Sequence, residues 1–451
     1  MGLRNDFAWG VATSSYQNEG SAYADGKGLS VWDVFSHEPG KIRDGSSGDV
    51  ACDQYRRIDE DIELMKALSI NSYRFSISWP RVQPEGKGEI NQKGLDYYDR
   101  LTDKLLENNI APYVTLFHWD LPYELHLQGG WLNRDITKYF AEFASVVTER
   151  LSDRVDHWIT QNEPQCYINA ALQNGEHAPG LKLSRKEGFL AAHHSLLSHG
   201  MAARAIKAVA KKHPVIGYAP ASWWLWSPET ENKNNIEACR RKTFSIDQDP
   251  LGGTAWWLDP VFLGQYPETA FQKYEAFMPD IKSEDMEIIS EPVDFIGMNV
   301  YQTYVGRDNG RGSCEEVPHV QGAALTGAGW PVTPQALYWG PKFYDERYHK
   351  PIIITENGMA GMDWIHMDGK VHDPQRIDFT RSYLSELKRA ADEGVDIRGY
   401  FHWTLMDNFE WTSGYTNRFG LIYVDFQNQK RIIKDSGIWY KSVIESNGEN
   451  I

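Results

Sequence analysis

YVTLF (Tyr113–Phe117) and HWIT (His157–Thr160) are short β-rich runs in the first half of the chain, each bounded by polar residues. Between them, apolar residues recur at intervals of three and four from Ile136 to Val147. This is the spacing of one face of an α-helix. A strand, a helix and a second strand in this order are typical of a βαβ unit with parallel strands.

The same alternation continues through the rest of the chain, with helical patterns such as Tyr55–Met65 and Leu190–Met201 between further β-rich runs. Eight strands alternating with helices indicate an α/β protein with a closed (β/α)₈ TIM barrel. An open doubly wound sheet usually carries a Gly-rich phosphate turn after its first strand, and GVATSSYQNEG (Gly10–Gly20) is not of that kind. The six further runs are Phe7–Ala12, Ser72–Ser78, Val215–Ala219, Phe295–Met298, Ile352–Thr355 and Gly399–His402.

The length of the chain fits one such barrel with long loops. A minimal barrel uses about 250 residues, so on the order of 200 remain for loops and extra elements. No low-complexity or Pro/Ser-rich linker divides the sequence, and we expect residues 1–451 to form a single catalytic domain. Its pocket is expected in the aromatic-rich stretches Ser222–Asp259 and Arg307–Trp339.

Composition and charge argue against several classes of protein. With 46 basic and 62 acidic residues, the formal net charge of −16 speaks against a nucleic-acid partner, because such binding depends on clustered Lys and Arg. No apolar run approaches the ~18 residues of a transmembrane helix, so no membrane association is expected. The four cysteines form no CxxC pair, and we expect isolated reduced thiols. MGLRNDFAWGVATSSY (Met1–Tyr16) shows no secretory signal, which favours a cytoplasmic protein.

Two glutamates follow β-rich runs at the C-terminal ends, where a barrel carries its active site. Glu163 follows the fourth run in TQNEP, and Glu356 follows the seventh in ITENG. These strands lie on opposite sides of an eight-stranded barrel, so the two side chains are expected to face each other across its mouth. One protonated and one ionised carboxyl group are what glycoside hydrolysis requires. The distance between them separates retaining from inverting enzymes, and the sequence leaves that distance open.

Other residues near these strand ends fit a sugar pocket. A pyranose ring has apolar C–H faces that stack on aromatic rings, and hydroxyl groups that need fixed donors and acceptors. Arg74 and Tyr301 are candidates to keep one carboxylate ionised, because a nearby cation and a donated hydrogen bond favour the charged form. The candidate aromatic platforms are Trp119, Trp330, Trp403 and Trp411, and the candidate polar residues are Gln17, His118, Asn162, Asn299, Tyr301 and Glu410.

The sequence indicates no metal and no cofactor. It contains no HExxH, GxSxG or P-loop motif. His193 and His194 lie within a helical pattern without an acidic residue at ligand spacing, and we expect a packed or half-exposed pair. His118 has no second metal ligand at a recognisable offset.

Seven motifs extend over nearly the full length of the chain. They are FAWGVATSSYQNEG (Phe7–Gly20), YRFSISWPRVQPEGKGEIN (Tyr73–Asn91), VTLFHWDLP (Val114–Pro122), TQNEP (Thr160–Pro164), GMNVY (Gly297–Tyr301), ITENG (Ile354–Gly358) and FHWTLMDNFEWTSGYTNRFGLIYVD (Phe401–Asp425). Together, in this order, they resemble glycoside hydrolase family 1, the β-glucosidase family.

The resemblance implies a retaining β-glycosidase that hydrolyses small-molecule β-glycosides from the non-reducing end through a covalent glycosyl-enzyme. β-Glucosides are the first expected substrates, with β-galactosides and β-fucosides next. The resemblance makes Glu163 the acid and later the base, and Glu356 the nucleophile. It also implies that Arg74, Asn299 and Tyr301 orient the nucleophile, that Gln17, His118, Asn162, Glu410 and Trp411 bind sugar hydroxyls, that Trp403 forms the floor, and that Trp330 lines the leaving-group side.

Single residues distinguish between alternatives within the same family. Gln161 and Asn18 replace residues that are commonly apolar in the family, which leaves the preferred sugar open. A 6-phospho-β-glycosidase usually lacks the equivalent of Glu410, whose charge is expected to repel a phosphate. A non-catalytic sugar-binding relative typically has lost one of the two carboxylates, and here both are present. The sequence leaves open which leaving group is preferred and whether the protein forms a homo-oligomer.

Overall fold

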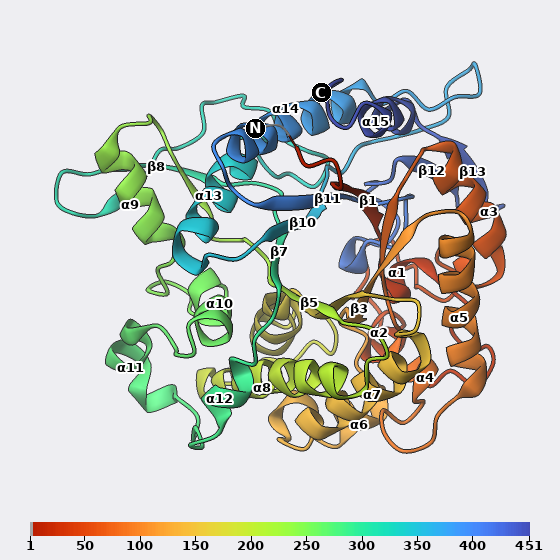
Figure 1. Cartoon of the computed structure of the whole chain (residues 1–451), viewed down its shortest axis with the longest axis horizontal. Coiled ribbons are helices and arrows are strands. Elements are labelled where there is room, and N and C mark those ends of the chain that lie inside the picture. The colour runs from red at the N-terminus through yellow and green to blue at the C-terminus, as the bar shows by residue number, and fades with distance from the viewer. Residues whose placement is uncertain (1–2) are drawn as a thin grey trace.

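The computed structural model describes residues 3–451; Met1 and Gly2, where the N-terminal segment considered above begins, lie outside the described residues. Eight parallel strands form a closed barrel in the order β1-β11-β10-β7-β5-β4-β3-β2, which confirms the predicted (β/α)₈ fold (Figure 1). The barrel strands are β1 (Ala8–Ala12), β2 (Ser72–Ser76), β3 (Ala111–Phe117), β4 (His157–Asn162), β5 (Val215–Ala219), β7 (Phe295–Asn299), β10 (Ile352–Asn357) and β11 (Ile397–Trp403).

Each predicted β-rich run corresponds to one of these strands, with ends that differ by at most two residues. β2 ends early because Ser78 already precedes the short helix α4 (Trp79–Val82). β4 and β10 run further than predicted, so that Glu163 directly follows β4 and Glu356 lies within β10. Glu356 therefore stands on a regular strand, and Glu163 stands at the turn directly after one.

Aromatic side chains fill the interior of the barrel. Tyr113, Phe295 and Phe401 belong to one buried cluster inside the strands. Two glycines make room for them: a Cβ at Gly10 would lie 2.4 Å from the ring of Phe401, and a Cβ at Gly217 would lie 2.3 Å from the ring of Phe295. The barrel is thus a packed core and closes the site from below.

The helices between the strands cover the outside of the barrel. The apolar residues of 136–147 are buried on one face of α7, as their spacing predicts. His193 and His194 are buried in α8, which confirms a packed pair, and His193 Nε2 lies 2.9 Å from Asp285 Oδ2 of a neighbouring helix. The outer helices are α3 (Gln54–Ala67), α5 (Gln92–Glu107), α7 (Ile136–Leu151), α8 (Arg185–Val209), α10 (Thr254–Phe262), α11 (Glu268–Tyr274), α12 (Asp285–Ile289), α13 (Ala336–Tyr348), α14 (Pro374–Asp392) and α15 (Asp435–Glu445).

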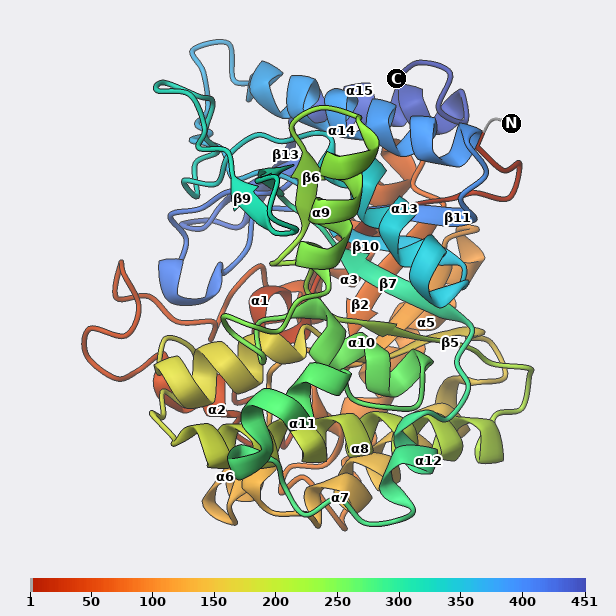
Figure 2. The same ribbon diagram turned by 90° about the vertical axis from the view of Figure 1, so that its left-hand side faces the viewer.

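The connections at the C-terminal ends of the strands contain further helices and strands. Parts of the two aromatic-rich stretches expected to line the pocket also form regular secondary structure. A small sheet has the order β6-β8-β9, and α9 packs against it (Figure 2). Among residues 3–451, no helix combines the length and apolar character needed to cross a membrane. The additional elements are α1 (Ser15–Asn18), α2 (Val31–Phe35), α6 (Tyr123–Leu127), η1 (Gly130–Leu132), η2 (Gln165–Asn174), β6 (Trp226–Pro228), α9 (Lys233–Thr243), η3 (Glu275–Phe277), β8 (Tyr304–Asp308), β9 (Cys314–Glu316), η4 (Trp411–Ser413), β12 (Ile422–Asp425) and β13 (Lys430–Ile433).

A buried ion pair ties the segment after β1 to the segment after β2. Arg81 Nε donates to Glu19 Oε2 at 2.8 Å, and the two side chains are only 1% and 5% exposed. Tyr98 donates to the other carboxylate oxygen at 2.7 Å, and Arg81 Nη2 donates to the carbonyl of Gly20 at 3.0 Å. Because both charged groups are buried away from water, each needs the other to compensate for its lost hydration.

We expect Arg81→Met to lower the free energy of unfolding by about 3–5 kcal/mol, because it leaves the Glu19 carboxylate buried without its cation. Denaturant unfolding followed by tryptophan fluorescence measures this loss. Lys138→Met is the matched control, since its pair with Asp135 has side chains 71% and 52% exposed and its loss should leave the free energy of unfolding nearly unchanged. Equal losses in the two variants would contradict the role given to the buried pair.

Candidate active site

A cavity of about 760 Å³ opens at the C-terminal ends of the barrel strands, and both Glu163 and Glu356 line it. They reach it from β4 and β10, which are separated in the barrel by β5 and β7. Gln17, Arg74 and Asn162 lie behind the wall and hydrogen-bond to residues that form it. The other predicted site residues line the cavity: His118, Trp119, Asn299, Tyr301, Trp330, Trp403, Glu410 and Trp411.

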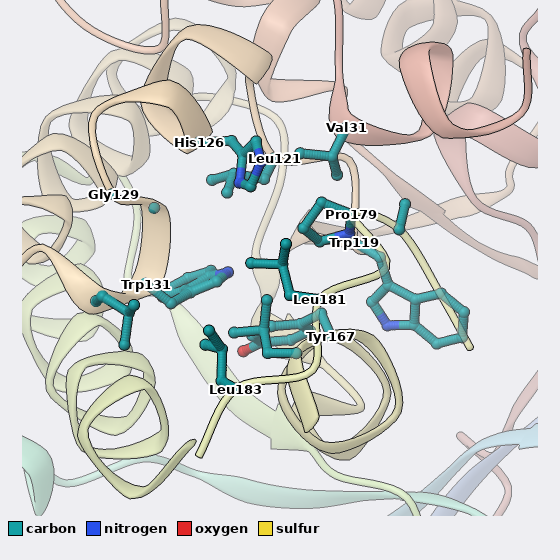
Figure 3. A pocket seen from close by; sticks show the side chains of 14 residues that line it. Val31, Trp119, Leu121, His126, Gly129, Trp131, Tyr167, Pro179, Leu181 and Leu183 are labelled. Carbon is teal, nitrogen blue, oxygen red and sulfur yellow. The ribbon is translucent and has the colours of Figure 1, made fainter. Parts of the chain in front are cut away.

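A second, smaller cavity of about 120 Å³ lies behind Trp119 (Figure 3). Leu121, Leu181 and Leu183 point into it, together with the ring of Trp131. Its lining contains no carboxyl group, so it cannot supply the two carboxyl groups that glycoside hydrolysis requires. The larger cavity is therefore the candidate active site.

Glu163 sits at the turn that ends β4. Its backbone is left-handed, with φ of 45°, and its N–H donates to the carbonyl of Ala219 at 2.8 Å. The carboxyl group accepts one hydrogen bond from Asn299 Nδ2 at 3.0 Å and one from Cys166 Sγ at 3.1 Å. Burial, followed by the negative charge of Glu356, raises the pKa of Glu163 to about 7. This is a carboxyl group suited to carry a proton near neutral pH.

Glu356 has strong donors on both oxygens. Arg74 Nη1 donates to Oε1 at 2.7 Å, and the hydroxyl of Tyr301 donates to Oε2 at 2.7 Å. Burial raises the pKa of Glu356, while the charge of Arg74 and the hydrogen bond from Tyr301 oppose the rise. Of the two glutamates, only Glu356 is paired directly with a cation. We therefore take it to be the ionised partner, in agreement with the roles predicted for Arg74 and Tyr301.

Asn299 is placed differently from the prediction that it orients the nucleophile. Its Nδ2 donates to Glu163 and also to Asn162 Oδ1 at 3.0 Å, while Thr355 donates to its Oδ1 at 2.7 Å. It also contributes to lowering the pKa of Glu356. Asn299 therefore bridges the two carboxyl groups instead of serving one.

A chain of hydrogen bonds connects Arg74 to a free donor in the cavity. Arg74 Nη2 donates to Asn162 Oδ1 at 2.5 Å, so the Asn162 amide nitrogen points to His118 Nε2, 3.1 Å away. Burial and the nearby charge of Arg74 hold the pKa of His118 well below its usual range, so its ring is neutral. With Nε2 accepting, the proton is on Nδ1, which has no hydrogen-bond partner among residues 3–451. His118 thus offers one N–H to a ligand.

Gln17 and Glu410 form a second polar group beside the cavity. Gln17 Nε2 donates to Glu410 Oε2 at 3.2 Å and to the carbonyl of Phe409 at 3.0 Å, and Ser14 holds Gln17 Oε1 at 2.7 Å. Burial, followed by the charges of Glu356 and Glu163, raises the pKa of Glu410 to about 8. A pKa near 8 favours the protonated form of this carboxyl group near neutral pH. The expectation that its negative charge repels a phosphate is therefore weakened.

Aromatic rings enclose these polar groups. The ring of His118 lies parallel to those of Trp403 and Trp411, at 5.8 Å and 5.9 Å between centroids. Trp119 packs on Trp411 at 4.3 Å, and its indole N–H donates to the Asn162 carbonyl at 2.9 Å. The predicted combination of aromatic faces and polar edges is present in one cavity.

Several lining residues were not predicted from the sequence. Cys166 stands three residues after Glu163, a spacing that brings side chains together on a helix, and this spacing was the available signal. The others come from distant segments and gave no sequence signal of their own, although Ser222, Trp223, Trp224, Asp249 and residues 327–329 fall in the two stretches that were expected to line the pocket. The further lining residues include Arg43, Asn169, Glu176, His177, Trp223, Trp224, Asp249, Tyr304 and Phe419.

A (β/α)₈ barrel with two buried carboxyl groups in one aromatic pocket defines a barrel glycoside hydrolase. Comparisons with known proteins specify it further. The model of the family described as glycosyl hydrolase family 1 matches residues 1–449, and this chain belongs to that family.

Relatives match over the whole length. The 1,4-beta-D-glucan glucohydrolase of Thermotoga neapolitana is 43% identical over 98% of this chain and 98% of its own. The bifunctional beta-D-glucosidase/beta-D-fucosidase of Bifidobacterium breve is 39% identical over 97% of each chain. A structure of the beta-glucosidase from Thermotoga maritima in complex with glucoimidazole is 42% identical, covers 99% of both chains, and superimposes with a TM-score of 0.90.

We expect Cys166→Ala to move the basic limb of the pH profile of kcat/KM to higher pH. Glu163 must be protonated to act as an acid, so activity falls as the pH rises through its pKa of about 7. The thiol donor favours the ionised carboxylate, so its removal raises that pKa. Initial rates on an aryl β-glucoside across pH measure the limb, and Cys166→Ser, which keeps a donor, is the matched control. A limb that stays fixed in both variants would rule out this contact.

Proposed function

We propose that this protein is a retaining β-glycosidase that acts first on β-glucosides and releases the sugar at the non-reducing end. One observation carries the proposal: two buried carboxyl groups share a cavity but have different partners. Glu356 has Arg74 and Tyr301, whereas Glu163 has the amide of Asn299 and the thiol of Cys166. Such contrasting environments separate an acid from a nucleophile.

In the first step, the ionised Glu356 attacks the anomeric carbon while Glu163 gives its proton to the glycosidic oxygen. The bond from the sugar to the leaving group breaks, and an ester between Glu356 and the sugar forms. Tyr301 and Arg74 hold the carboxylate in place for the attack. The protonated state of Glu163 is favoured because burial and the charge of Glu356 both oppose its ionisation.

In the second step, Glu163 changes from an acid to a base. Once Glu356 is esterified, its negative charge is gone, and one cause of the raised pKa of Glu163 disappears with it. Glu163 then ionises more readily and can accept a proton from the water that attacks the ester. The cycle ends with free sugar and both glutamates in their starting states.

The sugar preference is supported by the polar groups around the cavity and by named relatives. His118 and Glu410 line the cavity as polar groups and Trp403 supplies an apolar face, while Asn162 and Gln17 hydrogen-bond to His118 and Glu410 from behind. These fit an unphosphorylated hexose. The relatives named as beta-glucosidase and beta-glucosidase/beta-fucosidase support β-glucosides first and β-fucosides second.

A 6-phospho-β-glycosidase is the second candidate. Its substrate needs cations, and among the described lining residues Arg43 is the one Lys or Arg side chain. A non-catalytic sugar-binding role has less support, because both carboxyl groups are in place.

The single-domain organisation, the cytoplasmic location and the oligomeric state stay predictions from the sequence. The continuous barrel supports one catalytic unit formed by the whole chain. Cell fractionation tests the location, and light scattering tests the oligomeric state.

Glu356→Gly is expected to abolish hydrolysis of aryl β-glucosides, because the variant lacks the nucleophile. Added azide should fill the vacated space, attack from the same face as the missing carboxylate, and give the α-glycosyl azide. Product analysis by NMR reads the anomeric configuration. The β-azide would show that Glu356 is not the retaining nucleophile.

Glu163→Ala should slow hydrolysis of natural glycosides about 10²–10⁴-fold, the usual contribution of general acid catalysis. Dinitrophenyl glycosides need no proton on the leaving group, so their glycosylation rate should stay near that of the unaltered enzyme. Pre-steady-state rates on both substrates make the comparison. Equal loss on both would count against Glu163 as the acid.

A further inference from the structure

Two of the four cysteines lie next to each other, which corrects the expectation of isolated thiols. Cys239 on α9 and Cys314 on β9 are 75 positions apart in sequence, yet their sulfur atoms are 3.8 Å apart. Cys239 is fully buried, and Cys314 is partly exposed. α9 and β9 lie side by side at the edge of the molecule (Figure 2).

Gly306 of β8 makes room for both sulfur atoms. A Cβ at this position would lie 2.5 Å from Cys314 Sγ and 3.0 Å from Cys239 Sγ, so no larger residue fits without moving them. β8 also pairs with β9 through Gly306 and Asp308, which fixes the strand that carries Cys314. The backbone thus holds the two thiols face to face.

The two thiols differ in reactivity. The hydrogen bond with Cys239 and the positive charges of Lys242 and Arg241 lower the pKa of Cys314. The contact with Cys314 and burial raise the pKa of Cys239. The thiol with the lower pKa is also the more accessible one, which is the usual arrangement of an attacking and a resolving cysteine.

We propose that Cys239 and Cys314 form a reversible dithiol–disulfide pair that cross-links α9 to the β8–β9 hairpin. The required oxidant is a low-molecular-weight disulfide such as oxidised glutathione.

The exchange has two steps. The Cys314 thiolate attacks one sulfur of the small disulfide, forms a mixed disulfide and releases the first small thiol. Cys239 then loses its proton and attacks Cys314 Sγ, which breaks the mixed disulfide and releases the second small thiol. Two protein thiols are oxidised, and one small disulfide is reduced to two thiols.

The cross-link would act on one wall of the cavity. Tyr304, on β8, stacks between Trp224 and Trp226, with ring centroids 5.7 Å and 4.9 Å away. Trp224 and Tyr304 line the cavity. The segment closed by the disulfide also contains Asn299 and Tyr301. Oxidation therefore restrains the part of the chain that supplies this wall.

Incubation of the full chain with oxidised glutathione, followed by mass spectrometry and thiol counting under denaturing conditions, tests the pair. We expect loss of the mass of two hydrogen atoms, two reactive thiols in place of four, and a peptide that joins Cys239 to Cys314. Dithiothreitol should restore the starting mass. Because the closed segment is long, the midpoint of thermal unfolding should rise by about 5 °C on oxidation.

Cys314→Ser is the matched control, and with the same treatment it should keep three thiols and an unchanged unfolding midpoint. Cys52 and Cys166 are also buried, and their thiols donate to oxygen atoms of Asp407 and Glu163, so they should stay reduced. Four free thiols after treatment, a stable glutathione adduct on Cys314, or a peptide that joins other cysteines would each overturn the proposal.

Discussion

The buried guanidinium of Arg74 is the interaction on which the rest of the structure depends. It donates to Thr115, to the Thr355 carbonyl, to Asn162 and to Glu356, and so connects four strands inside the barrel. A cation at this depth is tolerated because each of its three nitrogens has a partner and one partner is a carboxylate. The same contact favours the ionised form of Glu356. The stability of the barrel and the chemistry of the cavity thus rest on one side chain.

Three residues of the cavity are held in a strained backbone conformation. Trp119, Glu163 and Trp411 have φ angles of 78°, 45° and 49°, a region that side chains rarely adopt. The surrounding contacts compensate, among them the hydrogen bond from Glu163 to Ala219 and the one from Trp119 to Asn162. Strained backbone of this kind is found mostly at functional sites, where the direction of a side chain matters more than a relaxed backbone conformation. Here it turns one carboxyl group and two rings toward the same space.

Much of the fold and of the pocket could be predicted from the sequence, because the signals were local. Short β-rich runs marked the strands, spacings of three and four marked the helices, and the strand-end residues led to the two glutamates. What escaped prediction depends on segments meeting in space. The position of Asn299 between both carboxyl groups, the raised pKa of Glu410 and the meeting of Cys239 with Cys314 follow from burial and long-range packing, which spacing along the chain does not encode.

The packed interior of the barrel sets the order of events in the proposed reaction. Because Tyr113, Phe295 and Phe401 fill the interior of the barrel, the way through the barrel is closed, and ligands are expected to enter and leave at the C-terminal ends of the strands. The departing group occupies that route, so water reaches the ester only after the group has gone. Any other hydroxyl compound that arrives first competes with water for the same position. The molecule that attacks the ester, rather than the catalytic pair, then determines whether the sugar is released by water or transferred to another hydroxyl compound.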